Sequence, residues 1–178
     1  MIIFIIGPGG VGKTTSGEIL AKLLSYKFID LDQKFCEQIE NIGTYINNEG
    51  YKKYCYKNSE LFYKILKNIK DNVVYVLSSG FLVHENLDDL VIKHKHTLKE
   101  SGISILLLPS NSIKECCKII VDRQLSRGFG LNKEKEKEKF ISRFPKYLKL
   151  GDIQIFSYDK PELIAERIEK ELVNKKIK

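Results

Sequence analysis

The sequence predicts an α/β fold with three α/β/α layers, built on a mainly parallel five-stranded sheet. Short apolar runs alternate along the chain with segments that carry apolar residues at helical spacing. The runs are continuously apolar, which is typical of parallel strands covered by helices on both faces. The chain has 178 residues with no internal repeat and no linker, so we expect one domain, residues 1–178.

Five segments have the composition of buried strands, with β-branched and other apolar side chains in short runs. They are Ile2–Ile6, Tyr26–Ile29, Val73–Leu77, Ile103–Leu108 and Ile153–Phe156. Pro109 ends the fourth strand, because proline cannot continue a central strand. In such a sheet ligands collect at the carboxyl ends of the strands, so the residues that follow each strand are the candidates for chemistry.

The segments between the strands are expected to be helical. They are Lys13–Leu24, a region from about Leu31 to Ile69 interrupted near Gly43 and Gly50, Glu85–Lys99, Ser112–Arg127, Lys133–Leu150 and Pro161–Asn174. Ser112 is a candidate N-cap and Gly128 a candidate stop signal. Pro161 fits the first turn of the last helix, where its missing N–H costs no hydrogen bond.

A glycine-rich turn follows the first strand. The residues that match the P-loop pattern G-x-x-x-x-G-K-[ST] are Gly7, Gly12, Lys13 and Thr14. Glycines let backbone N–H groups approach a polyphosphate, Lys13 suits the β and γ phosphates, and the Thr14 hydroxyl suits Mg²⁺. The N-terminus of the next helix adds partial positive charge. The strand and helix on either side favour a nucleotide site over a structural turn. The residues expected to bind ATP here are Gly9, Gly10, Val11, Gly12, Lys13, Thr14 and Thr15.

Composition indicates a soluble globular protein, with 43% hydrophobic and 30% charged residues. The apolar runs are shorter than a bilayer span, and the start of the chain lacks the pattern of a secretory signal. The four cysteines form no C-x-x-C pair, which favours reduced thiols in a cytoplasmic enzyme over a disulfide framework or a metal site. We expect a monomer without a membrane partner.

The net charge of +7 raises the question of whether the protein binds nucleic acid. Most of it comes from lysines that alternate with glutamates, and in Lys133–Lys139 the charges nearly cancel. Since no basic stripe with interleaved aromatic residues is present, the pattern favours a solvated face over a nucleic-acid surface.

Two carboxylates follow the second strand, in the segment Phe28–Asp32. Asp30 or Asp32 can hold Mg²⁺ or its waters, and the other can orient and deprotonate an acceptor hydroxyl. The alternative is that Asp30 caps the helix that begins at Leu31. Ser78–Gly80, after the third strand, can contact magnesium waters or let a substrate approach the backbone, although an ordinary turn explains it equally well.

The sequence contains four arginines, namely Arg123, Arg127, Arg143 and Arg167. Arginine presents a planar charged fork that suits phosphate and carboxylate oxygens. Arg123 and Arg127 share a helix face just before Gly128–Gly130, a candidate hinge. This arrangement predicts a helical lid, about residues 123–140, that closes over ATP and expels water. A solvated helix end is the alternative.

Four segments together resemble the shikimate kinases in order along nearly the whole chain. They are the P-loop Gly7–Thr14, the F-x-D-x-D segment Phe28–Asp32, the arginine-bearing lid, and the R-x-P-x-Y segment Arg143–Tyr147. The resemblance implies a nucleoside-monophosphate-kinase-like P-loop domain. It also implies an ATP- and Mg²⁺-dependent kinase that transfers the γ-phosphoryl group to a hydroxyl of a small anionic acceptor.

The resemblance implies a role for individual residues. Asp32 would hold the acceptor hydroxyl, and Asp30 would lie near the metal beside Thr14. Arg127 would stabilise the transferring group, which makes the implied catalytic set Lys13, Asp32 and Arg127. Arg143 would grip a substrate carboxylate, with Gly80 near the substrate and helices in about residues 31–70 around it. Tyr158–Pro161 resembles the adenine-contacting loop, so Pro161 would bind the nucleotide.

The acceptor half departs from the family pattern. Cys55 stands where the family has an arginine that binds the substrate carboxylate, and Asn58 where it has a glutamate. Lys52 or Lys53 is a candidate replacement for that arginine. Phe81 and Leu82 stand at two glycine positions, where we expect them to add bulk beside the substrate ring, and the lid lacks the R-P-L-L run. These departures leave two alternatives: a kinase of a different polyol or hydroxy acid, and a nucleotide-binding module without catalysis.

Overall fold

The computed structural model describes residues 1–126 and 132–175. Its strands form one sheet with the order β2-β3-β1-β4-β5, and every neighbouring pair is parallel. The strands are β1 (Ile2–Ile6), β2 (Lys27–Asp30), β3 (Val73–Val76), β4 (Ile103–Leu108) and β5 (Ile153–Phe156). The predicted five-stranded sheet is therefore confirmed, and it is parallel throughout.

Helices connect the strands as the alternating pattern predicted. They are α1 (Lys13–Leu24), α2 (Leu31–Gln38), α3 (Ile42–Glu49), α4 (Tyr51–Lys67), α5 (Asp88–Ser101), α6 (Ile113–Leu125), α7 (Lys133–Tyr147) and α8 (Pro161–Asn174). None of the helices in the described ranges is long and apolar enough to cross a bilayer.

The expected breaks near Gly43 and Gly50 are both confirmed, although the first lies at residues 39–41 and not at the glycine itself. Gly43 lies inside α3, and the chain leaves helical geometry earlier, at residues 39–41. The side chain of Asn41 caps α3 by accepting from the Thr44 N–H at 3.1 Å. Gly50 has φ of 87°, a left-handed value that separates α3 from α4 at little steric cost. The cap at Asn41, and not Gly43, therefore sets the start of α3.

The other helix boundaries differ from the prediction by a few residues. Ser112 caps α6, as predicted, because its hydroxyl accepts from the Glu115 N–H at 3.5 Å. The expected stop at Gly128 lies outside the described residues. The α5 helix begins at Asp88, three residues later than expected, because Asn86 has a positive φ of 58° that a helix does not allow.

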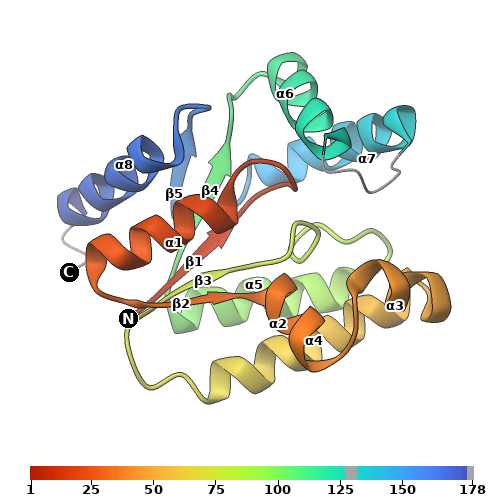
Figure 1. The fold of residues 1–178 in the computed structure, drawn as a ribbon, viewed down its shortest axis with the longest axis horizontal. Coiled ribbons are helices and arrows are strands. Elements are labelled where there is room, and N and C mark those ends of the chain that lie inside the picture. Colours follow the sequence, from red (N-terminus) through yellow and green to blue (C-terminus); the bar gives the residue numbers. More distant parts are fainter. Residues whose placement is uncertain (127–131, 176–178) are drawn as a thin grey trace.

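Helices cover both faces of the sheet, which makes three layers (Figure 1). On one side α1 and α8 lie next to each other, and α4 and α5 lie on the opposite side. Successive residues of β1 alternate between the two cores: Ile3 and Ile5 face the first, Phe4 and Ile6 the second. The predicted α/β/α layering is therefore confirmed.

Close packing fixes the helix that carries the P-loop. A Cβ on Gly17 of α1 would lie 2.7 Å from Cγ2 of Val76 on β3, so the helix approaches the sheet closely. This contact holds the start of α1 above the carboxyl ends of β1 and β3, where the strand order predicts a ligand site.

Candidate active site

The turn between β1 and α1 has the backbone geometry that its glycines predicted. Gly7, Gly10 and Gly12 have φ values of 145°, 79° and 93°. A Cβ on Gly7 would also lie 2.5 Å from the carbonyl oxygen of Leu107 on β4. Other residues would strain this turn, because L-amino acids with side chains rarely adopt positive φ.

Lys13 lies folded back under the turn. The residue is only 8% exposed, and its Nζ donates to the carbonyl oxygens of Gly7 and Pro8, each at 2.9 Å. Its charge is therefore held at the centre of the loop, in line with the N-terminus of α1. A buried ammonium, a helix N-terminus and a glycine cradle are the groups that fit a polyphosphate.

Asp30 has the capping role that the sequence allowed, and it also reaches the P-loop. Its Oδ2 accepts from the Thr14 hydroxyl at 2.7 Å. Its Oδ1 caps α2 by accepting from the N–H groups of Asp32 at 2.9 Å and Gln33 at 3.1 Å. Thr14 and Asp30 present a hydroxyl and a carboxylate side by side, a donor set that fits Mg²⁺, which binds few protein ligands and several waters or phosphates.

Asp32 belongs to a partly buried hydrogen-bond network that joins α2, the loop after β3 and α4. The Ser78 hydroxyl donates to Oδ1 of Asp32 at 2.5 Å, and Nδ2 of Asn58 donates to the Ser78 oxygen at 2.9 Å. Ser78 and Asn58 are both buried. Ser78 therefore orients the carboxylate of Asp32. An ordinary turn at the end of a strand would not need this hydrogen bond. Sequence reasoning placed Asn58 at a departure from the family, but did not foresee that it supports Asp32 through Ser78.

Arg143 lies against two residues that sequence reasoning missed, Tyr51 and His84. Its Nη2 donates to the Tyr51 hydroxyl at 3.3 Å, and that hydroxyl lies 3.0 Å from Nδ1 of His84. Cys55 Sγ is 3.5 Å from the same Nδ1. The only sequence signal was indirect, since Tyr51 and Cys55 share one face of α4 and His84 follows the third strand closely.

Burial keeps the groups beside Arg143 uncharged. It lowers the pKa of His84 to about 4, with Arg143 and His94 contributing in the same direction. It raises the pKa of the Cys55 thiol to about 11. At neutral pH both side chains are therefore neutral. Lys53 does not replace the missing arginine, because its Nζ pairs with Glu49 at 2.6 Å on the surface, and Lys52 is exposed.

The expectation that Phe81 and Leu82 add bulk to the acceptor site is wrong. Both side chains point into the core, with 1% and 5% of their surface exposed. The Phe81 ring stacks on His94 with centroids 3.8 Å apart and an interplanar angle of 11°. Gly80 is the residue beside the polar cluster, since a Cβ there would lie 2.8 Å from the Tyr51 oxygen.

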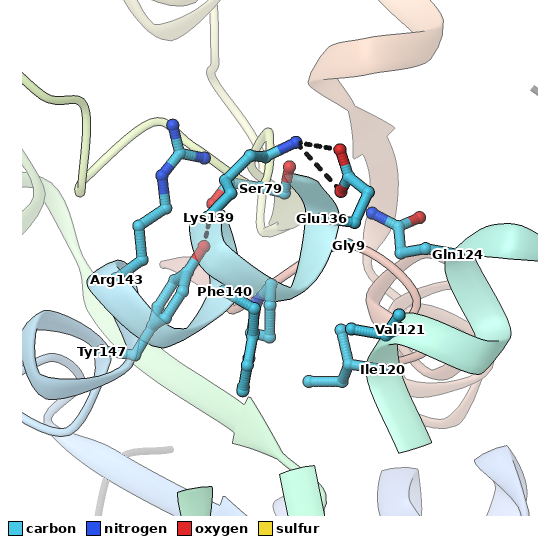
Figure 2. A pocket seen from close by; sticks show the side chains of 11 residues that line it. Gly9, Ser79, Ile120, Val121, Gln124, Glu136, Lys139, Phe140, Arg143 and Tyr147 are labelled. Atoms are coloured by element: carbon cyan, nitrogen blue, oxygen red, sulfur yellow. Dashed lines mark hydrogen bonds and ion pairs between the residues drawn. The ribbon is translucent and has the colours of Figure 1, made fainter. Parts of the chain in front are cut away.

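The α6 and α7 helices lie over the P-loop (Figure 2). Between them and the loop is a small cavity of about 30 Å³. Its lining residues are Pro8, Gly9, Ser79, Ile120, Val121, Gln124, Glu136, Lys139, Phe140, Arg143 and Tyr147. The Tyr147 hydroxyl donates to the Ser79 carbonyl, which holds the end of α7 near the end of β3. Parts of the predicted lid are thus next to the nucleotide loop, whereas Arg127 lies outside the described residues.

The remaining predicted nucleotide residues lie at two places. Val11 is buried in the core beneath the turn, and Thr15 is exposed on the first turn of α1. Pro161 begins α8, as predicted, directly after the loop that follows β5. Its contact with adenine remains a prediction.

Together these features define a class of protein. A parallel sheet with a P-loop after β1, an aspartate pair after β2 and two helices over the loop form the nucleoside-monophosphate-kinase-like fold of P-loop kinases. A family model described as shikimate kinase matches residues 9–173. The chain belongs to the shikimate kinase family, and the family resemblance of its motifs is confirmed.

Individual relatives agree with this assignment. The chain is 33% identical to a shikimate kinase of Clostridium botulinum over 135 residues, 76% of this chain and 73% of that protein. It is 26% identical to the pentafunctional AROM polypeptide of Schizosaccharomyces japonicus over 82% of this chain, and the match spans 9% of that much longer protein. A solved shikimate kinase from Acinetobacter baumannii, in complex with shikimate, has the same fold, with a TM-score of 0.78, 21% identity and coverage of 99% and 95% of the two chains.

Proposed function

We propose that this protein transfers the γ-phosphoryl group of ATP to a hydroxyl of shikimate, with Mg²⁺. The observation that supports this most directly is the link between the two halves of the site. Thr14, in the P-loop, donates to Asp30, and Asp30 caps the helix on which Asp32 stands. A phosphate cradle and a candidate base are therefore held together by two adjacent hydrogen bonds.

In the proposed reaction the acceptor oxygen attacks the γ phosphorus while its proton passes to Asp32. The bond between the γ phosphorus and the bridging oxygen breaks, and ADP leaves. Lys13 and the P-loop amides hold the phosphates and offset the charge that develops on them. Thr14 and Asp30 would hold Mg²⁺, which supplies charge neutralisation when bound. Arg127 would stabilise the transferring group, as the family resemblance implies.

The acceptor is proposed from the polar groups on the other side of the site. Arg143 supplies a guanidinium suited to a carboxylate, and Gly80 lies beside the same polar cluster. The Clostridium botulinum relative is a shikimate kinase, and the Acinetobacter baumannii structure is of a complex with shikimate. The ordered Asp32, Ser78 and Asn58 network supports catalysis over a module that only binds nucleotide.

We propose a single kinase domain in which helices of residues 31–70 surround the acceptor and residues 123–140 act as a lid, and which works as a cytoplasmic monomer with ATP and Mg²⁺. The position of α6 and α7 over the P-loop supports the lid. We propose that the adenine ring of ATP contacts Pro161.

The test is ³¹P NMR of the protein incubated with ATP, MgCl₂ and one acceptor at a time. The acceptors are shikimate, a hydroxy acid without a ring such as glycerate, and a polyol without a carboxylate such as inositol. We expect ADP and a new phosphate ester with shikimate, and neither product when EDTA removes the metal. Phosphorylation of another acceptor without shikimate, or of none, would overturn the proposal.

A further inference from the structure

The hydrogen bond between Arg143 and Tyr51 has a fixed direction. A guanidinium can only donate, so the Tyr51 oxygen accepts from Nη2 of Arg143 at 3.3 Å. The Tyr51 proton is then available for its second neighbour, Nδ1 of His84, at 3.0 Å. If Nδ1 carried a hydrogen instead, the phenol would accept twice and its own proton would be left to solvent. The geometry therefore favours a relay from Arg143 through Tyr51 to His84.

Cys55 supports the same direction. Its thiol is buried, and burial raises its pKa to about 11, so the sulfur carries a proton at neutral pH. That sulfur lies 3.5 Å from Nδ1 of His84. Both neighbours of Nδ1 thus have a proton to donate, which makes Nδ1 the acceptor. The neutral imidazole then carries its hydrogen on Nε2.

The relay leaves two buried N–H groups without a hydrogen-bond partner in the described part of the chain, Nε of Arg143 and Nε2 of His84. The two residues are 8% and 2% exposed. Unpaired buried donors are costly, and native proteins seldom keep them without a reason. In arginine, Nε and Nη2 together form one side of the guanidinium, and this side can donate to both oxygens of a carboxylate. Here Nη2 is held by Tyr51 and Nε has no partner among the described residues.

Arg143 lies between two openings. It lines the small cavity beside the P-loop, and together with Tyr51 it lines an open cleft of about 610 Å³. The other lining residues of that cleft are Glu85, Asn86, Lys135, Glu138, Lys139 and Ser142. A small acceptor in the cleft would therefore reach Arg143 and Tyr51 together, and Arg143 also lines the cavity beside the nucleotide loop.

We propose that Tyr51 and His84 determine which acceptor this enzyme takes, by fixing the Arg143 guanidinium to receive one carboxylate group. This inference rests on the proposed function and names the recognition element of its acceptor site. Tyr51 is a positioning residue that acts through Arg143, and His84 holds Tyr51. Because Tyr51 and His84 are neutral, Arg143 is the charged member of these three residues, and the favoured acceptor has a carboxylate in preference to its uncharged amide.

The test compares shikimate with its carboxamide in steady-state kinetics. The variant is Tyr51→Phe, and the matched control is Tyr56→Phe, which removes an exposed phenol from the same helix. We expect the wild type to prefer shikimate by at least about tenfold in kcat/KM. Tyr51→Phe should raise the KM for shikimate about tenfold, leave the KM for ATP unchanged, and reduce the preference over the amide. Tyr56→Phe should change none of these.

A double variant separates positioning from a general effect on structure. In an Arg143→Lys background, Tyr51→Phe should have little further effect, because the group that it positions is gone. Equal losses with shikimate and its amide, or an unchanged KM for shikimate in Tyr51→Phe, would overturn the inference. Full additivity of the two substitutions would do so as well.

The tautomer of His84 gives a readout that needs no turnover. Imidazole ¹⁵N shifts of the wild-type protein at pH 7 should assign the hydrogen to Nε2, and Tyr51→Phe should shift the Nδ1 signal. A hydrogen on Nδ1, or a cationic ring, would overturn the relay. If the wild type does not phosphorylate shikimate, the proposed function fails, while the relay is still judged by these shifts.

Discussion

The Thr14 hydroxyl donates to Oδ2 of Asp30 at 2.7 Å, and this bond joins the P-loop to the start of α2. The same carboxylate caps α2 through its other oxygen. One side chain therefore has a structural task and a position suited to metal binding, and the two can be separated by substitution.

We expect Asp30→Asn to keep the cap and lose the charge. An asparagine oxygen can still accept from the N–H groups of Asp32 and Gln33, so stability should change by less than about 0.5 kcal/mol. The Mg²⁺ concentration for half-maximal turnover should rise about tenfold, because a carboxylate next to the metal site is gone.

Asp30→Ala is the companion variant. It should lose the cap as well, and lower the free energy of unfolding in urea by about 0.5–2 kcal/mol. Equal stability of the alanine and asparagine variants would contradict the capping role, and an unchanged Mg²⁺ requirement in both would contradict the role at the metal.

The two buried histidines should make stability depend on pH. Burial lowers the pKa of His84 and of His94 to about 4, from an ordinary value of 6.5. Below pH 6.5 the unfolded chain binds protons that the folded protein does not, so stability falls as the pH falls towards 4. Each histidine should contribute about 1.5 kcal/mol of loss between pH 6.5 and 5.

Urea unfolding at these two pH values checks this prediction. His94 donates from Nδ1 to the Phe81 carbonyl at 3.1 Å and accepts from Ser59 at Nε2, at 2.8 Å, which leaves no place for a second proton. His94→Gln should therefore reduce the pH dependence, whereas His96→Gln, at an exposed position, should leave it unchanged. An equal slope in all three proteins would refute the assignment.

Phe81→Ala should destabilise the protein without improving acceptor binding. The ring is buried between His94 and Phe62, so its removal leaves a cavity that costs about 3–5 kcal/mol. Since the side chain faces away from the acceptor cluster, the KM for shikimate should be unchanged in the protein that remains folded. Thermal unfolding and kinetics at a low temperature measure both effects. A markedly lower KM would mean that Phe81 obstructs the substrate after all.

Local chemistry allowed much of the fold to be predicted. The apolar runs placed the five strands within a residue or two, and Ser112 placed the start of α6, because caps and strand composition act over a few residues. The break expected near Gly43 lies just before it, at residues 39–41, because the Asn41 side chain caps α3 there. Glycine alone is a weak boundary signal.

The site was predictable only where a motif is contiguous. The P-loop and the pair Asp30 and Asp32 could be found from spacing, and the structure brings them together. Tyr51 and His84 are 33 residues apart and meet only through packing, so no spacing rule reveals them. The side chain of Phe81 was expected beside the substrate, but it lies in the core. A loop that follows a strand has no regular alternation of apolar and polar residues from which its buried side chains could be predicted.

The most direct test of the account is the rate of shikimate phosphorylation by Asp32→Asn at saturating ATP and Mg²⁺. The account predicts ATP affinity equal to that of the wild type and turnover lower by a factor of about 10²–10⁴, since a candidate general base is lost. Lys13→Ala serves as the reference, with both ATP affinity and turnover reduced. Wild-type turnover in Asp32→Asn would contradict the central claim that this carboxylate acts on the acceptor beside the P-loop.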